Sequence, residues 1–256
     1  MPNPRPIQLL PIHNIPEIRP GDNLSRIFLT AAKKSKITFQ QNDILVLAQK
    51  IISKSENRLI DLTTITPSQR AIDLAAKSDK DRPKDPRLVE LILRESRRIV
   101  REHPVLIVET HHGFVCANAG VDQSNIPGET IVSLLPENPD TSAKKIAQAI
   151  KKITRKKIAV IISDTFGRPW RLGLTNVAIG CYGISPMEDL RGTRDMHKKP
   201  LHATIIALAD ELAAAAGLLM QKSSATPAIL IRNYPFKPSS ASAATIIRPP
   251  DLDLFR

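Results

Sequence analysis

The stretch KIAVIISDTFGRPWR, residues 157–171, decides the fold. Its first part, Lys157 to Ser163, is the clearest strand pattern in the chain, because a short run rich in β-branched apolar residues is typical of a buried strand. The run ends in Asp164 and Thr165, and a glycine follows where the chain turns. A carboxylate and a hydroxyl at the end of a rigid strand suit a hard cation such as Mg²⁺ or Mn²⁺. The stretch therefore predicts a strand that carries a metal site at its end.

Two arginines, Arg168 and Arg171, stand on either side of the single tryptophan in the turn that follows this strand. Guanidinium groups in this position can clamp a phosphate or a carboxylate, which makes Arg168 a candidate catalytic residue and Arg171 a candidate substrate ligand. The alternative is an aspartate that only caps the next element, with both arginines facing solvent. A tryptophan between two arginines in a loop favours the functional interpretation.

The rest of the chain predicts strands and helices that interleave irregularly. Apolar runs predict strands over residues 7–10, 43–48, 105–109, 114–117 and 227–232 and within 173–183. Capping residues and prolines predict helices that begin near Asp22, Thr66-Pro67, Asp85-Pro86 and Asn138-Pro139, the second and third covering residues 71–77 and 88–99. The Ala-rich stretch 203–220 is either a helix or a strand followed by one. This order favours an α+β fold of mixed sheets with flanking helices.

Composition limits the classes of protein to consider. The 256 residues suit one large domain or two small ones, and a formal net charge of +12 favours anionic partners: nucleic acid, an acidic membrane surface or phosphorylated small molecules. A solvated basic surface explains the charge equally well. Only 4% of the residues are aromatic and no stacking motif is present, which argues against nucleic acid. The sequence has no G-x-x-x-x-G-K-[ST] and no G-x-G-x-x-G, so it supports neither a P-loop nor a dinucleotide-binding Rossmann fold.

Three further clusters are candidate site residues. Asp122 and Asn125 follow a predicted strand and offer oxygen ligands, although the pattern alone favours an Asx-rich turn. Arg191 could bind an anionic substrate, but a loop in which arginines and aspartates pair with each other is just as consistent with the sequence. Lys54 lies in a short polar stretch after the buried strand predicted over residues 43–48. Its side chain could contact a phosphate or simply be solvated. The histidines, His111, His112, His197 and His202, are interpreted as surface residues.

The remaining features indicate a soluble cytoplasmic protein. Cys116 and Cys181 lack metal-ligand spacing and lie in apolar surroundings, so we expect buried, reduced thiols. The proline-broken N-terminus lacks the apolar core of a signal peptide, and the stretch 203–220 carries two acids in its middle, which a bilayer would disfavour. From Lys237 onwards, Pro, Ser and Ala predict an extended tail.

Taken together, these segments resemble the coenzyme F420-0:L-glutamate ligases, the gamma-glutamyl ligase family of deazaflavin coenzyme biosynthesis. The resemblance runs in order from residue 9 to the C-terminus, through LPIHNIPEIRPGDNL, DILVLAQKIISKSEN, PSQRA, GFVCANAGVDQSN, IISDTFGRPWRLG, AIGCYGISPMEDLRG, LADELAAAAGLLM and IIRPPDLDLFR. The segments NAGVDQSN and SDTFGRPWR are specific to the family, whereas the others alone would be weak.

The resemblance implies an intertwined homodimer, with residues 1–236 forming a ligase domain of one or two subdomains and residues 237–256 belonging to the same domain. It implies that GTP phosphorylates the terminal carboxylate of F420-0 and that the amine of L-glutamate attacks the acyl phosphate. Further glutamates would be added through gamma linkages. The implied ions are two divalent cations, Mg²⁺ or Mn²⁺, with K⁺ as a further ion. Nucleic acid and membranes are not implied as partners, and a related amide ligase acting on another phosphorylated carboxylate remains the alternative.

Site residues follow from the resemblance position by position. Asp122 and Asp164 are similar to ligands of one metal ion and Thr165 to a ligand of the second, which makes both aspartates catalytic. The positions similar to GTP contacts are Ile15, Pro16, Glu17, Ile18, Gln49, Lys50, Lys54, Asn125, Gln221, Lys222 and Ser223. The chain departs from the family pattern directly after Met220, where Gln221 replaces a glycine in the loop that approaches GTP.

Overall fold

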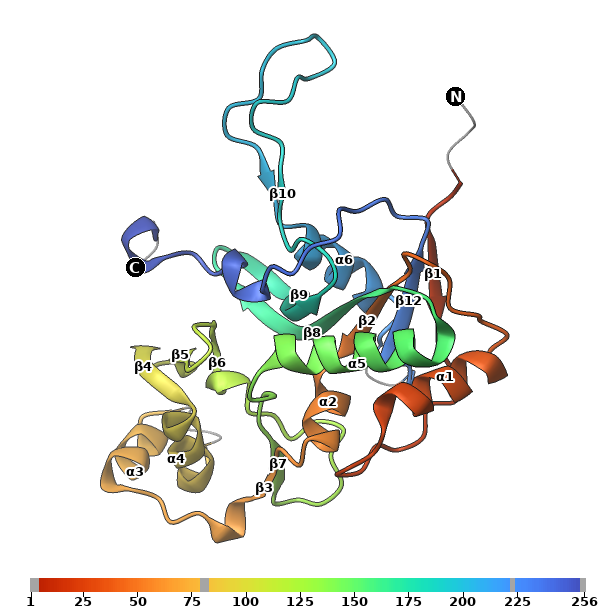
Figure 1. The fold of residues 1–256 in the computed structure, drawn as a ribbon. Coiled ribbons are helices and arrows are strands. Elements are labelled where there is room, and N and C mark those ends of the chain that lie inside the picture. The colour runs from red at the N-terminus through yellow and green to blue at the C-terminus, as the bar shows by residue number, and fades with distance from the viewer. Residues whose placement is uncertain (1–4, 79–82, 222–223, 254–256) are drawn as a thin grey trace.

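The predicted strand over residues 157–163 lies inside the central sheet of the protein (Figure 1). The structure is a computed structural model that describes residues 5–78, 83–221 and 224–253, and its central sheet has five strands in the order β1-β12-β2-β8-β9. These strands are β1 (Gln8–Pro11), β12 (Ala228–Arg232), β2 (Ile44–Ala48), β8 (Ala159–Arg168) and β9 (Arg171–Tyr182). Only β2 and β8 are parallel neighbours in this sheet. The sheet is therefore mixed, as predicted.

Each face of this sheet has its own hydrophobic core, because alternate residues of a strand point to opposite faces. Leu45 and Leu47 of β2 face α1, α2 and α5, whereas Ile44 and Val46 face α6. These helices are α1 (Leu24–Lys34), α2 (Gln49–Ser55), α5 (Pro139–Thr154) and α6 (Leu208–Gly217). Helices thus flank both faces of the sheet, and the α+β class with mixed sheets is confirmed.

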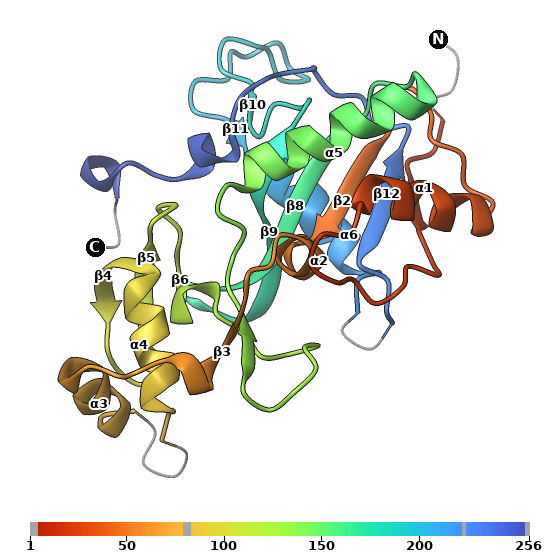
Figure 2. The same ribbon diagram turned by 60° about the horizontal axis from the view of Figure 1, so that its bottom comes forward.

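A smaller unit with a third hydrophobic core lies beside the central sheet (Figure 2). We call residues 59–133 the small lobe. Its elements are β3 (Leu59–Asp61), η1 (Leu62–Thr64), α3 (Gln69–Ala76), α4 (Pro86–Arg94), β4 (Ser96–Arg101), β5 (Ile107–Thr110), β6 (Val115–Ala117), η2 (Asn118–Gly120) and β7 (Ile131–Ser133). The predicted strands over residues 105–109 and 114–117 correspond to β5 and β6, which pair as a hairpin.

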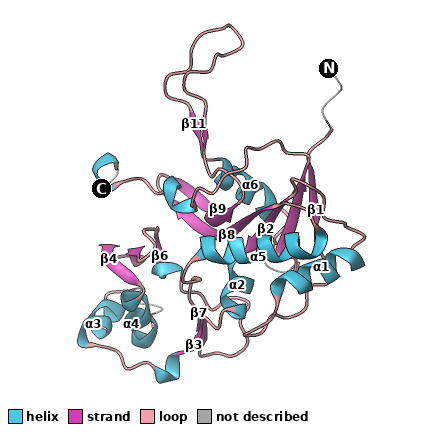
Figure 3. Cartoon of the chain, viewed as in Figure 1, coloured by secondary structure: helices cyan, strands magenta, loops and turns pink. Residues whose placement is uncertain are grey.

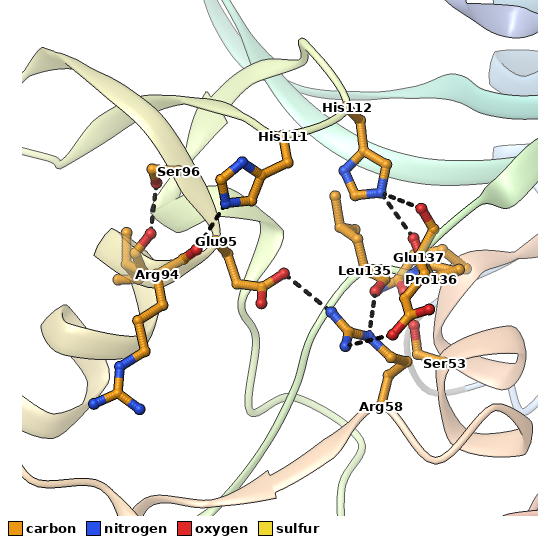
Figure 4. Close-up of polar contacts among 12 residues, drawn as sticks. Ser53, Arg58, Arg94, Glu95, Ser96, His111, His112, Leu135, Pro136 and Glu137 are labelled. Carbon is orange, nitrogen blue, oxygen red and sulfur yellow. Dashed lines mark hydrogen bonds and ion pairs between the residues drawn. The ribbon is translucent and has the colours of Figure 1, made fainter.

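Arg58 ties the small lobe to the segment that enters α5 (Figure 4). Its Nη2 lies 3.0 Å from a carboxylate oxygen of Glu95, which follows α4, and its Nε donates to the Leu135 carbonyl at 3.0 Å. His112, in the turn between β5 and β6, reaches the Pro136 carbonyl with Nε2 at 2.9 Å. Two parts of the small lobe are therefore fixed to the same stretch of chain.

Two segments extend away from the sheet and its helices (Figure 3). One is a long extension that starts and ends in the short strands β10 (Glu188–Asp189) and β11 (Ile205–Ile206). The other is the C-terminal segment, which contains only the short turns η3 (Ala243–Ile246) and η4 (Pro250–Leu252) within its described residues, in agreement with the predicted tail. No helix in the described part of the chain is long and apolar enough to cross a membrane.

Two predicted helix starts are off by one or two residues. Asn23 caps α1 rather than Asp22, because the Asp22 carboxylate accepts from the Arg19 amide and so closes the preceding turn. Ser68 caps α3 rather than Thr66, since its side chain accepts from the third amide of that helix.

The helix predicted over residues 88–99 is too long. α4 ends at Arg94, and residues 96–101 form β4, which pairs with β5. Backbone pairing with a strand distant in sequence outweighs local helix propensity here. In contrast, the stretch 203–220 takes the second of its two predicted forms, a strand, β11, followed by a helix, α6.

Gly180→Ala is expected to destabilise the fold. Gly180 of β9 packs directly against the start of α5, and a Cβ added there would lie 2.5 Å from the Pro139 carbonyl carbon. Such overpacking costs about 1–3 kcal/mol, so the thermal midpoint should fall by roughly 3–10 °C in differential scanning fluorimetry. Gly167→Ala in β8 is the matched control, because the nearest atom to its added Cβ is 4.0 Å away. Equal losses in both variants would contradict this account.

Candidate functional site

A cavity of about 790 Å³ lies beyond the C-terminal end of β2 and beside the middle of β8. The predicted end of the strand at Asp164 and Thr165 is wrong, because both residues continue to pair with β9 and β8 ends only at Arg168. Its walls come from the segment before α1, the β2–α2 junction, the η2 loop, β8 and β9, and the loop after α6. Most of the predicted metal- and nucleotide-binding residues line it: Ile15, Pro16, Glu17, Ile18, Gln49, Lys50, Lys54, Asp122, Asn125, Asp164, Thr165 and Gln221. The sequence therefore identified residues from five separate segments that the fold brings to one place.

The parallel pairing of β2 and β8 explains why two of these segments meet. Ala48, the last residue of β2, pairs with Ser163. Gln49 and Lys50 follow Ala48 at the start of α2, and Asp164 follows Ser163, so both groups emerge at the same end of the sheet. The carboxyl ends of parallel strands are a common place for a binding site for this reason.

A left-handed turn carries Asp122 to the cavity. Asn118, Ala119 and Gly120 all have positive φ, at 54°, 54° and 70°. This conformation is costly for the two residues with a Cβ, and strain of this kind persists only where the surroundings enforce it. Here Ala119 is buried in the core of the small lobe, which holds the turn. Asp122 then bonds to Ser133 through both backbone groups.

The Asp122 carboxylate is already paired with a cation. Oδ2 lies 2.6 Å from Lys50 Nζ, and the amide and hydroxyl of Ser124 also donate to the carboxylate. Burial opposes the charged form of Asp122, but the hydrogen bonds from Lys50 and Ser124 outweigh it and lower the pKa of this carboxyl. Asp122 is therefore an ionised carboxylate at neutral pH.

Lys54 provides a second buried cation in the same wall. Its Nζ lies 2.5 Å from Glu17 Oε1, and its side chain is only 7% exposed, whereas that of Glu17 is 61% exposed. Glu17 thus comes from the segment before α1 to neutralise a lysine of α2. Both lysines of this helix are held by carboxylates that a bound anion could replace.

The oxygen groups of the cavity fit a hard divalent cation. The Lys50 ammonium stands where a cation would be held by Asp122, and Asp164 and Thr165 add a carboxylate and a hydroxyl in the same cavity. Among residues 5–78, 83–221 and 224–253, no three His, Cys, Asp or Glu side chains are grouped to hold a metal ion. A site with two carboxylates and a hydroxyl suits Mg²⁺ or Mn²⁺, which usually complete their ligands with water and phosphate oxygens.

Sequence reasoning missed several residues of this cavity. Asn176 of β9 lies opposite Thr165, and its Nδ2 donates to Ser163 Oγ at 2.9 Å. Phe166, Leu174 and Asn118 also line the wall. The register of the β8–β9 hairpin brings Asn176 here, and that register contains a shift after Ile162 that no sequence pattern revealed.

The cysteines are buried and free, as predicted. Cys116 lines the cavity, where burial, with a further contribution from the Asp164 charge, raises the pKa of its thiol to about 12. The thiol is therefore protonated at neutral pH and unsuited to act as a nucleophile.

Three predicted arginines lie outside the cavity. Arg168 and Arg171 are exposed on the β8–β9 hairpin, where Arg168 Nη2 donates to the Leu172 carbonyl. Arg191 lies in the extension and forms a bidentate pair with Asp189, which is the self-paired arrangement that the sequence left open. In a single chain the structure therefore does not bring these arginines to the two carboxylates. The predicted positions Lys222 and Ser223 lie outside the described residues.

Comparisons with known proteins find a matching family model and relatives over nearly the whole chain. Residues 13–233 match the family model described as F420-0:Gamma-glutamyl ligase. The chain is 42% identical to the coenzyme F420:L-glutamate ligase of Methanothermobacter thermautotrophicus, over 98% of this chain and 99% of the relative. It is also 42% identical to the protein of that name from Methanopyrus kandleri, over 94% of each chain, and 36% identical to the one from Haloarcula marismortui, over 98% and 96%.

Proposed function

Because the chain belongs to the F420-0:gamma-glutamyl ligase family, we propose that it joins L-glutamate to coenzyme F420-0 in a GTP-dependent reaction. The observation that carries the proposal is one cavity lined by the carboxylates of Asp122 and Asp164 and by the ammonium groups of Lys50 and Lys54. Carboxylates that hold cations, beside cations that hold phosphates, are what phosphoryl transfer requires.

The first step activates the carboxylate, which is a poor electrophile at neutral pH. A carboxylate oxygen of F420-0 attacks the γ-phosphorus of GTP, a new P–O bond forms, and the bond to the β–γ bridging oxygen breaks to release GDP. In the second step the neutral amine of glutamate attacks the acyl carbon. The C–O bond to phosphate breaks, the amide forms, and the departing phosphate takes up the amine proton. Further gamma-linked glutamates would be added by the same two steps.

Different residues of the cavity would bind the phosphates of GTP and the divalent ions. Lys54, which is held by the exposed Glu17, binds the triphosphate when GTP displaces that carboxylate. Lys50 gives up Asp122 when a cation binds there and turns its ammonium to the phosphates. Asp122 and Asp164 would hold one divalent ion and Thr165 a second. When bound, these ions neutralise charge on the transferred phosphoryl group. K⁺ completes the proposed set of ions.

An isotope experiment tests the proposed chemistry. F420-0 labelled with ¹⁸O in its carboxylate is incubated with GTP, Mn²⁺ and L-glutamate. One ¹⁸O should then appear in the released phosphate for every amide formed, because the acyl phosphate breaks at the C–O bond. Amide formation without label in phosphate would rule out the acyl-phosphate route, and equal turnover without any nucleoside triphosphate would rule out the dependence on GTP.

We also propose that the protein acts as a homodimer, with residues 1–236 as its ligase domain, residues 237–256 as part of the same domain, and a family fold that is neither P-loop nor Rossmann. Large apolar side chains are exposed on the β8–β9 hairpin and on the extension between β10 and β11. Leu172 and Trp170 on the β8–β9 hairpin are 98% and 83% exposed, and Met196 on the extension is 90% exposed. Apolar side chains gathered on projecting segments are typical of surfaces that a partner covers.

Leu172→Asp is expected to shift the protein from dimer to monomer, because it places a charge in the apolar surface that a second copy would cover. Sedimentation velocity at micromolar concentration measures the change. Ile153→Asp on α5 is the control, since that side chain is also exposed, at 55%, but lies on another surface. A Leu172→Asp protein that sediments as the wild-type dimer would remove the hairpin from the interface.

A further inference from the structure

A second cavity of about 230 Å³ lies along the outer edge of β9. Its walls come from the turn before β6, from β8 and β9, and from α6 and the C-terminal segment. Most of the lining side chains are apolar: Phe114, Phe166, Val177, Ala243, Ile246 and Ile247. Pockets for whole ligands usually measure about 300–1,000 Å³, so a cavity of this size suits one part of a larger ligand.

This cavity adjoins the site described above. Phe166 lines both cavities. Val177, which lines the second, lies opposite Asp164 in the β8–β9 register. Residues directly opposite on antiparallel strands share one face of a sheet, with Cβ atoms about 4.5–5.5 Å apart. A ligand that occupies the second cavity can therefore reach the candidate metal ligand in the first.

Aromatic rings form a row that ends at Phe166, the residue common to both cavities. His112 stacks on Phe114 with ring centroids 5.6 Å apart, and Phe114 meets Phe166 edge to face at 6.1 Å. His112, predicted at the surface, is half-buried in this row. Because aromatic rings pack favourably on one another, the Phe114 ring favours a flat aromatic ligand in the second cavity.

Two charged groups give the second cavity its polarity. Asp210, at the start of α6, accepts from the Ala178 amide at 2.8 Å through Oδ1, and this is the only hydrogen bond to its carboxylate within the described residues. Oδ2 is therefore left for a donor in the cavity. Burial raises the pKa of the Asp210 carboxyl, which indicates that its charge is poorly solvated. Arg248 of the C-terminal segment adds a donor to the same lining.

We infer that this second cavity holds the deazaflavin ring of the coenzyme, while its terminal carboxylate reaches Asp164 in the first cavity. The inference rests on the proposed function and assigns one part of its substrate to a site. The ring is flat and apolar on its faces, which suits Phe114 and Phe166. The imide N–H on its edge donates to Asp210 Oδ2, and a neighbouring ring carbonyl accepts from Arg248.

Two variants of different kinds test the inference. Ile247→Trp fills the cavity from the C-terminal segment, and Asp210→Asn removes the charge while it keeps an oxygen for the Ala178 amide. The probe is the deazaflavin chromophore with only its ribityl chain, whose binding is followed by fluorescence anisotropy. Each variant should weaken probe binding and raise KM for F420-0 by about tenfold, the loss expected for one buried charge-assisted contact, with KM for GTP unchanged.

The controls are the same substitutions at positions outside the cavity. Leu252→Trp and Asp251→Asn change exposed residues of the same C-terminal segment and should bind the probe like the wild type. If Ile247→Trp and Asp210→Asn both keep wild-type probe affinity and KM, the ring binds elsewhere, whatever the activity. If Ile247→Trp and Asp210→Asn weaken probe binding but the wild type adds no glutamate to F420-0, the ring site is supported and the proposed ligase function is wrong.

Discussion

Asp164→Asn is expected to reduce amide formation at least about a thousandfold, because it removes the charge of the proposed metal ligand, and metal-ion stabilisation of phosphoryl transfer is worth several kcal/mol. Asp164 lies at the end of the apolar part of β8, half-buried in the main cavity. The asparagine has the same shape and leaves the β8–β9 backbone pairs intact, so the thermal midpoint should change little. Steady-state rates and circular dichroism melting measure the two effects.

A measurement of metal binding distinguishes the proposed role of Asp164 as a metal ligand from a purely structural role. Electron paramagnetic resonance of Mn²⁺ with the free protein should show weaker binding in Asp164→Asn. Asp73→Asn, on the exposed surface of α3, is the control and should leave both Mn²⁺ binding and turnover unchanged. Wild-type turnover in Asp164→Asn would remove this residue from the metal site.

Asp43→Ala is expected to lower the free energy of unfolding by about 3 kcal/mol, since it leaves the largely buried Arg232 guanidinium without its carboxylate, with only the Thr38 carbonyl as a partner. Asp43 precedes β2, and its side chain is 2% exposed. It forms a bidentate pair with Arg232 of β12, with distances of 2.9 Å to Nε and 2.8 Å to Nη2. Urea denaturation measures the loss.

The chain offers a matched control for burial. Asp189 pairs with Arg191 in the same bidentate geometry, at 2.9 Å and 2.6 Å, but this pair lies exposed on the extension. Exposed ion pairs contribute little to stability, so Asp189→Ala should leave the urea midpoint unchanged. A loss in Asp189→Ala as large as that in Asp43→Ala would show that burial does not determine the effect.

The parts of the fold that the sequence predicted are those that depend on neighbouring residues. The apolar run that became β8 and the Asn138-Pro139 start of α5 are local signals, and the structure confirms both. The end of α4 was predicted too late, because residues 96–101 pair with β5 instead of continuing the helix. Local propensity carries no information about such a partner.

The candidate site was predictable to a different extent. Asp164 and Thr165 stood out by themselves, whereas Asp122 resembled a turn residue until the family pattern placed it with them. The structure confirms the turn contact of Asp122, whose carboxylate accepts from the Ser124 amide two residues on, and adds a contact with Lys50, 72 positions away. The Lys54–Glu17 contact and the position of Asn176 depend on tertiary packing. Residue patterns in the sequence do not reveal this packing.

One measurement tests the central claim most directly. Purified protein is incubated with F420-0, L-glutamate, GTP and Mn²⁺, and the coenzyme is examined by mass spectrometry. We expect new species heavier by one or more glutamyl residues, which disappear when GTP or the divalent cation is omitted. A coenzyme of unchanged mass, under conditions in which a known F420-0:gamma-glutamyl ligase extends it, would contradict the proposed function.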